Sequence, residues 1–294
     1  LSRGLGDVYK RQVHLCVHSC YSLLEGTAAP EQLVARAAGY GMKALALTDT
    51  GGLYGAIPFY QAAREAGIKP IIGVELDRPS LAGGLRPADG TVLLARNRAG
   101  YTRLCQIVTA YQLGERESFD LAEYVNEDVF VCSADAGQIR TFYARGIKPL
   151  VVISHYGDPA SRYQASRLRA LAFELGLRPV AVNPVYFLEP ADRRVHAVLT
   201  AIRLNTTVDQ LQPSDLAPSG AWFRPPEEME RLYGDWPETL RNTEWVADQC
   251  ELELEASSPL FPECPVPVGE TAFTHLRQLV LEGARKQYGI LTHE

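Results

Sequence analysis

The sequence predicts an α/β fold in which strands and helices alternate and the strands close, or nearly close, into a barrel. Short apolar runs rich in β-branched residues alternate with helical patterns from residue 13 onward, and seven such runs occur before residue 184. Buried apolar strands separated by helices are typical of parallel βαβ units. Polar residues directly follow several of these runs, as they do at the C-terminal face of a barrel.

The order of the elements is read from the alternation of these patterns. The first predicted helix has Pro30 in its first turn and Gly41 just past its end, which are the positions that favour these residues. The apolar periodicity of another helix places Leu104, Ile107 and Tyr111 on one face. The predicted strands are 13–17, 44–48, 70–76, 91–95, 129–133, 150–154 and 179–183, and the predicted helices between them are 29–41, 53–67, 99–113, 136–145 and 159–175.

The pattern changes after about residue 200. Residues 224–250 read as two helices, each with proline near its start, and residues 256–270 hold five prolines or glycines and read as a linker. A final amphipathic helix is predicted over 271–289, with Phe273, Leu276, Leu279, Val280 and Ala284 at helical spacing. We therefore predict a barrel over 13–200, a helical extension over 201–255, and a linker and helix over 256–294. Residues 1–12 are interpreted as non-native or disordered, and the chain as a fragment.

Composition excludes several functional classes. No apolar run has the length of a membrane span, and the six cysteines form no CxxC pair, which favours a reducing cytoplasmic setting over a disulfide-stapled secreted one. The net charge of −6 argues against a stand-alone nucleic-acid-binding domain, since such domains carry a basic excess. If the chain works near DNA, other segments must supply most of the phosphate contacts.

Three potential metal ligands alternate in the first predicted strand. His14, Cys16 and His18 would share one face, and imidazole and thiolate both bind zinc. Further polar residues lie at the predicted carboxyl ends of other strands, where a barrel places its working groups. These residues are Thr48, Asp49, Thr50, Glu75, His155 and Asn183.

Several long motifs resemble one family. The segments "HLCVHSCYSLLEG", "ALALTDTGGLYGAIPFYQAAREAGIKPIIGVEL" and "LEPADRRVHAVLTAIRLNTTV" are similar to the N-terminal region of bacterial DNA polymerase III alpha-type subunits. That region is a PHP domain, named for polymerase and histidinol phosphatase. The segment "FPECPVPVGETAFTHLRQLVLEGARKQYG" resembles the stretch that leads to the polymerase palm. The resemblance implies a distorted (β/α)7 PHP barrel followed by a mostly helical connecting segment.

In family members with an intact site, the resemblance implies several metal ions on histidines and carboxylates. Such a centre can hydrolyse phosphodiesters, because clustered divalent ions clamp the phosphate and activate a water. Transferred residue by residue, the remaining candidate ligands here are His18, Glu25, Glu75 and, more weakly, Cys16. Family ligands are replaced at Cys16, Thr50, Pro184 and Tyr186, and by apolar residues around Val152. We therefore predict that the barrel cannot hold a multi-ion centre and is catalytically inactive, with no catalytic residue in this fragment.

The parent chain, by resemblance, would synthesise DNA from deoxynucleotides with Mg²⁺ held by palm aspartates beyond residue 294. Its implied partners are DNA, a proofreading exonuclease subunit and a sliding clamp; no membrane association is expected. Two alternatives stay open. One is an active metal-dependent phosphoesterase or 3'-5' exonuclease that uses Zn²⁺ or Mn²⁺ on the four candidate ligands. The other is an error-prone alpha-like polymerase in DNA repair.

Each candidate residue also has a structural interpretation, which we favour. His18, Glu25 and Glu75 would form a hydrogen-bonded polar cluster, and Cys16 a small buried hydrophobe. His14 and His155 would make structural hydrogen bonds, and His196 would lie on a helix face. The arginines of the 159–178 region would form a solvated helix face, although they could also contact nucleic acid or a partner; they are Arg162, Arg167, Arg169 and Arg178. The glycines of "GGLYG" at 51–55 are expected in a turn rather than a nucleotide loop.

Overall fold

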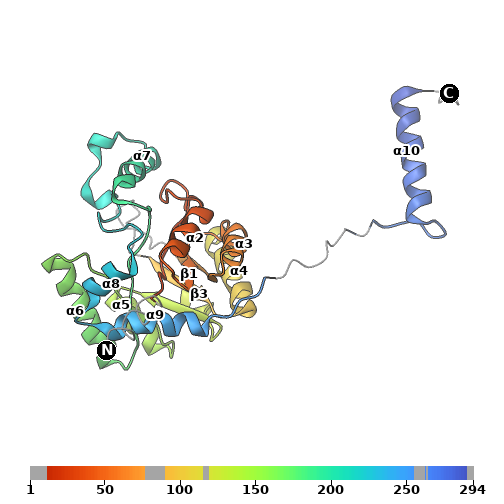
Figure 1. Ribbon diagram of the computed structural model, residues 1–294. Helices are drawn as coiled ribbons and strands as arrows, with labels where there is room; N and C mark the ends of the chain where they lie inside the picture. The colour runs from red at the N-terminus through yellow and green to blue at the C-terminus, as the bar shows by residue number, and fades with distance from the viewer. Residues whose placement is uncertain (1–11, 77–89, 115–118, 255–261, 263, 290–294) are drawn as a thin grey trace. The chain divides into compact units, whose positions relative to one another are not determined.

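The computed structural model describes residues 12–76, 90–114, 119–254, 262 and 264–289 (Figure 1). Residue contacts divide the chain into one unit that ends at Leu254 and a second that begins at Glu255. Almost all of the segment predicted to be non-native, 1–12, lies outside the described residues, as does half of the predicted linker. None of the described helices is long and apolar enough to cross a bilayer.

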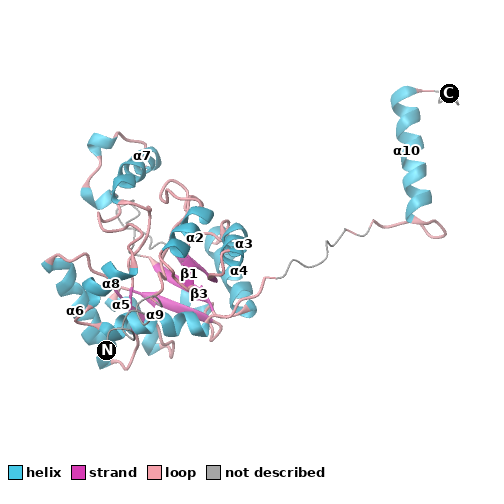
Figure 2. Ribbon diagram, in the orientation of Figure 1, coloured by secondary structure: helices cyan, strands magenta, loops and turns pink. Residues whose placement is uncertain are grey.

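Six strands form one curled sheet at the centre of the first unit, and helices surround it (Figure 2). The sheet order follows the chain, from β1 to β6. The strands are β1 (Ala44–Leu47), β2 (Lys69–Leu76), β3 (Thr91–Ala95), β4 (Val129–Ser133), β5 (Leu150–Ile153) and β6 (Pro179–Ala181). The predicted α/β class and its curled sheet are confirmed.

The expectation of an all-parallel sheet is wrong at one strand. β3 pairs antiparallel with both β2 and β4, whereas the other neighbours in the sheet are parallel. The chain enters β3 from the 77–90 connection, where the sequence shows glycines and prolines in place of a helical pattern. A helical crossover is needed to bring a strand back parallel, and a loop returns it antiparallel.

The predicted first strand, 13–17, is extended chain without a regular ladder, and Val17 makes only an isolated bridge to Val185. Backbone hydrogen bonds nevertheless connect this segment to both edges of the sheet. The amides of Ala46 and Thr48 in and after β1 donate to it, and Val185 beyond β6 bonds to it on the other side. Side chains replace ladder bonds along it: Val17 N donates to Thr48 Oγ1 at 2.9 Å. This substitution explains why no continuous strand forms.

Alternate residues of the strands fill the inside of the curled sheet, as period-2 geometry requires. This interior cluster includes Ala46, Ile71, Leu94, Cys132 and Val152. The opposite faces of the same strands pack against helices in three further clusters. The surrounding helices are α2 (Pro30–Gly39), α3 (Ala56–Glu65), α4 (Arg98–Leu113), η1 (Leu121–Glu123), α5 (Ala136–Ala144) and α6 (Pro159–Glu174).

Polar side chains start three of these helices. Asn97, Asp135 and Asp158 each accept a hydrogen bond from the backbone amide three residues later, at α4, α5 and α6. Such caps satisfy amides that have no partner within the helix. Asp135 and Asp158 set the points at which the chain leaves the loops after the carboxyl ends of β4 and β5, whereas Asn97 lies at the opposite end of the sheet.

The predicted helical extension packs within the first unit. It follows η2 (Pro190–Asp192) and α7 (Arg193–Arg203), and comprises η3 (Val208–Gln210), η4 (Pro213–Asp215), α8 (Pro226–Tyr233) and α9 (Pro237–Gln249). Met229 and Tyr233 of α8 lie in the cluster that covers β5 and β6. Val246 and Ala247 of α9 belong to the interior cluster of the sheet. Residues 201–254 therefore contribute to the barrel core.

The second unit contains α10 (Ala272–Tyr288), close to the predicted 271–289 helix. Thr271 caps it, with its side chain accepting from the amide of Thr274. Its apolar residues, Phe273, Leu276, Leu279 and Val280, are all at least half exposed.

Candidate metal site

The candidate ligands come from segments that the sheet brings together. His18 follows the extended 13–17 segment, which bonds to β1, while Thr50 and Glu75 pair at the carboxyl ends of β1 and β2. The amide of Glu75 donates to Asp49 O at 3.2 Å, and the amide of Gly51 donates to Glu75 O at 2.8 Å. The prediction that these residues share the carboxyl end of the sheet is confirmed.

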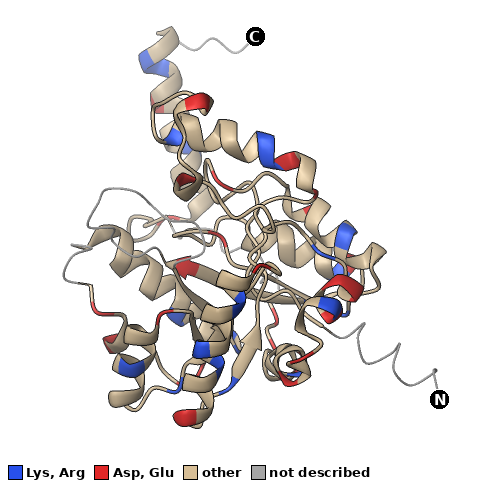
Figure 3. Cartoon of the chain, turned by 90° about the vertical axis from the view of Figure 1, so that its left-hand side faces the viewer, with Lys and Arg blue, Asp and Glu red and all other residues tan. Residues whose placement is uncertain are grey.

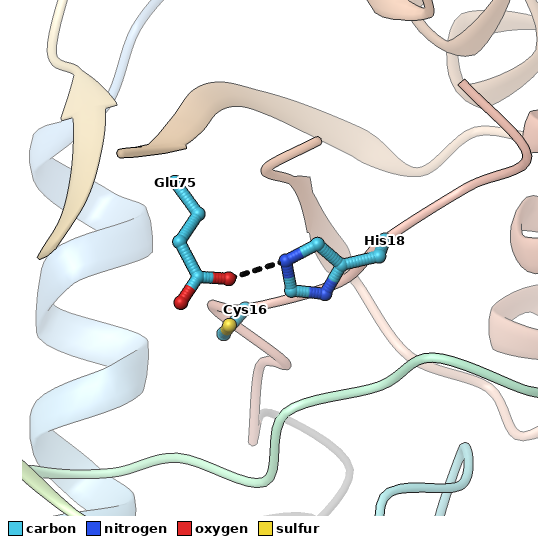
Figure 4. A group of neighbouring side chains, drawn as sticks. All are labelled: Cys16, His18 and Glu75. Atoms are coloured by element: carbon cyan, nitrogen blue, oxygen red, sulfur yellow. Dashed lines mark hydrogen bonds and ion pairs between the residues drawn. The ribbon is translucent and has the colours of Figure 1, made fainter. Parts of the chain in front are cut away.

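Cys16, His18 and Glu75 form a buried group whose potential ligand atoms lie within 4.8 Å of one another (Figure 4). His18 Nε2 lies 2.5 Å from Glu75 Oε2, and its Nδ1 lies 3.2 Å from the carbonyl of Val185. Both ring nitrogens therefore face hydrogen-bond acceptors. Burial opposes a charge on His18, but Glu75, with help from Glu25 and Asp49, raises its pKa above the usual value. The geometry fits an imidazolium paired with the Glu75 carboxylate.

Cys16 contributes little as a ligand in this state. The residue is 3% exposed, and burial together with the nearby Glu75 carboxylate raises the pKa of its thiol well above the usual range. The thiolate is the form that binds metal. A cation would have to displace the protons of both Cys16 and His18 to enter this group.

Glu25 is not part of the Cys16, His18 and Glu75 group and contacts other residues. Thr50 Oγ1 donates to Glu25 Oε2 at 2.8 Å, and Arg203 Nη1 of α7 lies 3.4 Å from Glu25 Oε1. Thr50, one of the positions at which the resemblance implies a replaced ligand, thus bonds to the carboxylate of a candidate ligand. Sequence reasoning missed Arg203, because nothing in the helical pattern of α7 indicates that it reaches Glu25.

Tyr186, another position at which the resemblance implies a replaced ligand, contacts both His18 and Glu75. Its ring stacks on the imidazole of His18, with centroids 4.1 Å apart and planes 7° from parallel. Its hydroxyl donates to Glu75 Oε2 at 3.4 Å. His18 and Glu75 thus contact each other and Tyr186.

Asp49 anchors the loop that carries the site. Its carboxylate accepts from the backbone amide of Ser19 at 2.7 Å and from the hydroxyls of Ser19 and Ser22. Burial raises the pKa of Asp49, and these hydrogen bonds oppose the rise. Gly26 closes the same loop, where an added Cβ would lie 2.0 Å from the carbonyl oxygen of Ser19. The loop geometry therefore depends on Asp49 and on a residue without a side chain.

The other histidines make structural contacts. His196 Nε2 accepts from the amide of Ala217 at 3.0 Å, so its Nδ1 carries the proton and donates to Glu25 O at 2.8 Å. His14 Nε2 lies 2.9 Å from Arg224 O, and burial lowers the His14 pKa to about 4. His155 packs against Tyr233 and Trp236, with ring centroids 4.6 Å and 5.4 Å away. His14 and His196 thus make structural hydrogen bonds, whereas the ring of His155 packs against aromatic side chains and its Nδ1 has no hydrogen-bond partner among the described residues.

Three arginines near α6 contact the α8–α9 region. Arg162 pairs with Asp235, and Arg169 Nε lies 2.6 Å from Glu238 Oε1. Arg178 stacks on Trp245 of α9. Arg162 and Arg169 therefore form intramolecular ion pairs, while Arg167 is exposed.

A family model described as the PHP domain matches residues 14–168, which is more than half of the 294 residues. The chain belongs to the PHP domain family. The PHP domain match covers the candidate ligands Cys16, His18, Glu25 and Glu75, and extends through β5 into α6.

Two relatives connect this PHP domain to polymerases. An "Error-prone DNA polymerase" of Mycobacterium bovis is 33% identical over 94% of this chain and 28% of its own length. The "DNA polymerase III subunit alpha" of Bacillus subtilis is 29% identical over 94% of this chain and 26% of its own length. The predicted resemblance to alpha-type subunits is confirmed, and the chain spans about a quarter of the length of these relatives.

Among solved structures, an amidohydrolase from Chromobacterium violaceum with bound sulfate is similar over 60% of this chain and 87% of its own. The two share 16% sequence identity, with a TM-score of 0.39.

Proposed function

We propose that this chain is the N-terminal part of a bacterial DNA polymerase III alpha-type polymerase, and that its PHP domain is a scaffold without hydrolytic activity. The polymerase relatives, which the chain matches over 94% of its length, support the first part. In the parent chain, DNA and deoxynucleotides are the substrates and Mg²⁺ the cofactor, bound by residues that follow this segment. A cytoplasmic location, a proofreading exonuclease subunit and a sliding clamp belong to the same proposal.

One observation carries the second part: protein groups neutralise both surviving carboxylates. Glu75 pairs with His18 and Tyr186, and Glu25 pairs with Arg203 and Thr50. A multi-ion centre needs carboxylates that face the ions and bridge them. In this chain, a cationic side chain or a hydroxyl group contacts each carboxylate in the place of a metal ion. The residues present do not fit a multi-ion centre.

A second candidate is a single ion held by Cys16, His18 and Glu75. The observation in its favour is the 4.8 Å spread of their ligand atoms, which is compatible with three ligands around one Zn²⁺. His18 also meets one requirement of metal-binding histidines, because Nδ1 faces a backbone carbonyl and leaves Nε2 for an ion. Against it, Nε2 is already bound to Glu75 at 2.5 Å.

Elemental analysis and a phosphodiesterase assay test both candidates together. The purified chain is incubated with Zn²⁺ or Mn²⁺, dialysed, and analysed for bound metal and for hydrolysis of bis(p-nitrophenyl) phosphate. The scaffold proposal expects less than one tightly held ion per chain and no turnover above that of Glu75→Gln. Two or more tightly held ions, with turnover that His18→Ala abolishes, would overturn it. A single ion that Cys16→Ser releases would establish the second candidate.

A further inference from the structure

A cavity of about 710 Å³ opens at the amino ends of the strands, away from the candidate metal site. Its lining includes Val129 and Leu150, which begin β4 and β5, and Arg178, which directly precedes β6. β3 alone runs against the other five strands, so those five begin at one end of the sheet. Glu75 and Asp49 lie at their opposite, carboxyl end. We call this space the amino-end cavity.

Basic side chains collect at this end. Arg96 follows the antiparallel β3, Lys148 lies just before β5, and Arg178 just before β6; all three line the cavity. Lys43 and Lys69, at the starts of β1 and β2, belong to the same end of the sheet. Basic and acidic residues are scattered over the chain (Figure 3), which carries a net charge of −6.

The three lining cations are not neutralised by the described part of the chain. Arg96 Nη1 donates to the backbone carbonyl of Glu127 at 2.7 Å, and Arg178 Nη1 donates to the amide oxygen of Asn242 at 3.3 Å. Neither acceptor carries a charge. Glu127 is the one acidic residue in the cavity lining, and its side chain is exposed. The lining therefore keeps a net positive charge of about two, since three cations face one carboxylate.

Two aromatic rings hold the guanidinium groups in place. Arg178 Cζ lies 4.0 Å from the Trp245 ring centroid, and Arg96 Cζ lies 4.8 Å from that of Phe130. The two rings are 5.7 Å apart, so they form a continuous base for the cations. A guanidinium that stacks on a ring keeps its N–H edge free for a phosphate, and its outer face can stack on a nucleobase.

We propose that the amino-end cavity binds nucleotide phosphate, either as a free nucleotide or as one unit of a single strand. The volume lies within the range of small-molecule sites, roughly 300–1,000 Å³. Fixed arginines on aromatic rings together with a free lysine are the elements with which proteins hold single-stranded nucleic acid. This site goes beyond the scaffold role and does not depend on the state of the metal site.

Fluorescence anisotropy with a labelled oligo(dT) tests the proposal on the whole chain. We expect Lys148→Glu combined with Arg178→Glu to weaken binding at least tenfold. Arg178→Lys keeps the charge but loses the stacked plane, and should weaken binding less than Arg178→Glu. Arg167→Glu is the matched control, because Arg167 is an exposed arginine outside the cavity lining. Circular dichroism confirms that each variant is folded, and Lys148→Glu alone is a milder second variant at an exposed position.

Competition assigns the source of the ligand. If dTTP displaces oligo(dT) at a lower concentration than inorganic tripolyphosphate does, the site binds a nucleotide. If a longer oligonucleotide binds more tightly than dTTP, the ligand is a unit of a single strand. Binding should also weaken with salt, with a slope in log–log form of about −1.4 for two phosphate contacts. No binding by the wild-type chain would overturn the proposal. Equal losses in Arg167→Glu and the double variant, or equal competition by tripolyphosphate, would also overturn it.

Discussion

Replacing Glu75 with glutamine tests whether the candidate site is held by a buried ion pair. The side chains of His18 and Glu75 are 0% and 4% exposed, and their charged atoms lie 2.5 Å apart. At an effective dielectric constant of about 20, this separation corresponds to a gross attraction of about 6–7 kcal/mol. Desolvation of both groups offsets much of it, and removal of one partner of a buried pair costs about 3–5 kcal/mol. We therefore expect Glu75→Gln to lower the free energy of unfolding by about 3 kcal/mol at pH 6.

The loss should depend on pH in a defined direction. The pKa of His18 is raised in the folded state, so folding takes up a proton. The stability that this linkage adds is complete below pH 6.5, the unfolded pKa, and is lost as pH rises through the folded pKa. The difference between wild type and Glu75→Gln should therefore shrink between pH 6 and pH 9. His14, whose pKa is lowered to about 4, titrates below this window.

Urea unfolding followed by circular dichroism at pH 6 and pH 9 measures both effects. Glu189→Gln is the matched control, because Glu189 forms an ion pair of 2.9 Å with Arg36 at the surface. An exposed pair of this kind contributes about 0–1 kcal/mol. A Glu75→Gln variant that loses no more stability than Glu189→Gln, or that loses the same amount at both pH values, would refute the buried-pair interpretation.

Three other predictions concern buried charged or titratable groups of the barrel unit. Arg203→Met should destabilise the fold by about 2–3 kcal/mol, since it leaves the Glu25 carboxylate buried without its cation. Urea unfolding measures this loss of stability. The double variant Arg203→Met with Glu25→Gln should regain part of the lost free energy of unfolding. Asp49→Ala removes the acceptor that anchors the 19–22 loop and should cost about 2–4 kcal/mol, with faster proteolysis in that loop. The buried His14 has a pKa of about 4 in the folded state, below its unfolded value of 6.5. The free energy of unfolding of the wild type is therefore fully present above pH 6.5 and falls as pH drops toward 4. His14→Asn should make this fall between pH 6.5 and pH 4 less steep.

Controls separate these effects from a general loss of stability. For Arg203, full additivity of the single variants in the double-mutant cycle would contradict a direct pair with Glu25. For Asp49, Asp215→Ala in the short helix η4, where the carboxylate accepts from the nearby Gln212 amide, should leave the proteolysis rate of the 19–22 loop unchanged. Equal rates for both variants would contradict the anchoring role. For His14, an acid limb identical to that of the wild type would contradict the buried neutral histidine.

Both buried carboxylates of the candidate site have partners within the chain. A carboxylate in a buried site is costly unless another group supplies charge or hydrogen bonds. Thr50 and Arg203 supply them to Glu25, and Tyr186 and His18 supply them to Glu75. These contacts allow the fold to keep both carboxylates without a bound cation.

The amino-acid sequence alone determined the α/β class, six of the seven predicted strands, and the end of the sheet at which the polar residues meet. These features follow from local hydrophobic periodicity and from the direction of βαβ units, which depend on neighbouring residues. The 77–90 connection, with glycines and prolines and no helical pattern, carried a signal for an antiparallel 91–95 strand that the parallel βαβ interpretation did not use. The sequence could not show that side chains bond the 13–17 segment in place of a ladder, because that depends on where the chain returns in space.

Only the tertiary structure decided which groups complete the site. Arg203 meets Glu25 because α7 folds back over the loop at the carboxyl ends of the strands, and Arg178 and Trp245 meet because α9 packs beneath the sheet. These pairs are far apart in sequence and share no periodic pattern. Their contacts arise from burial and short distances, which exist only once the whole barrel unit has folded.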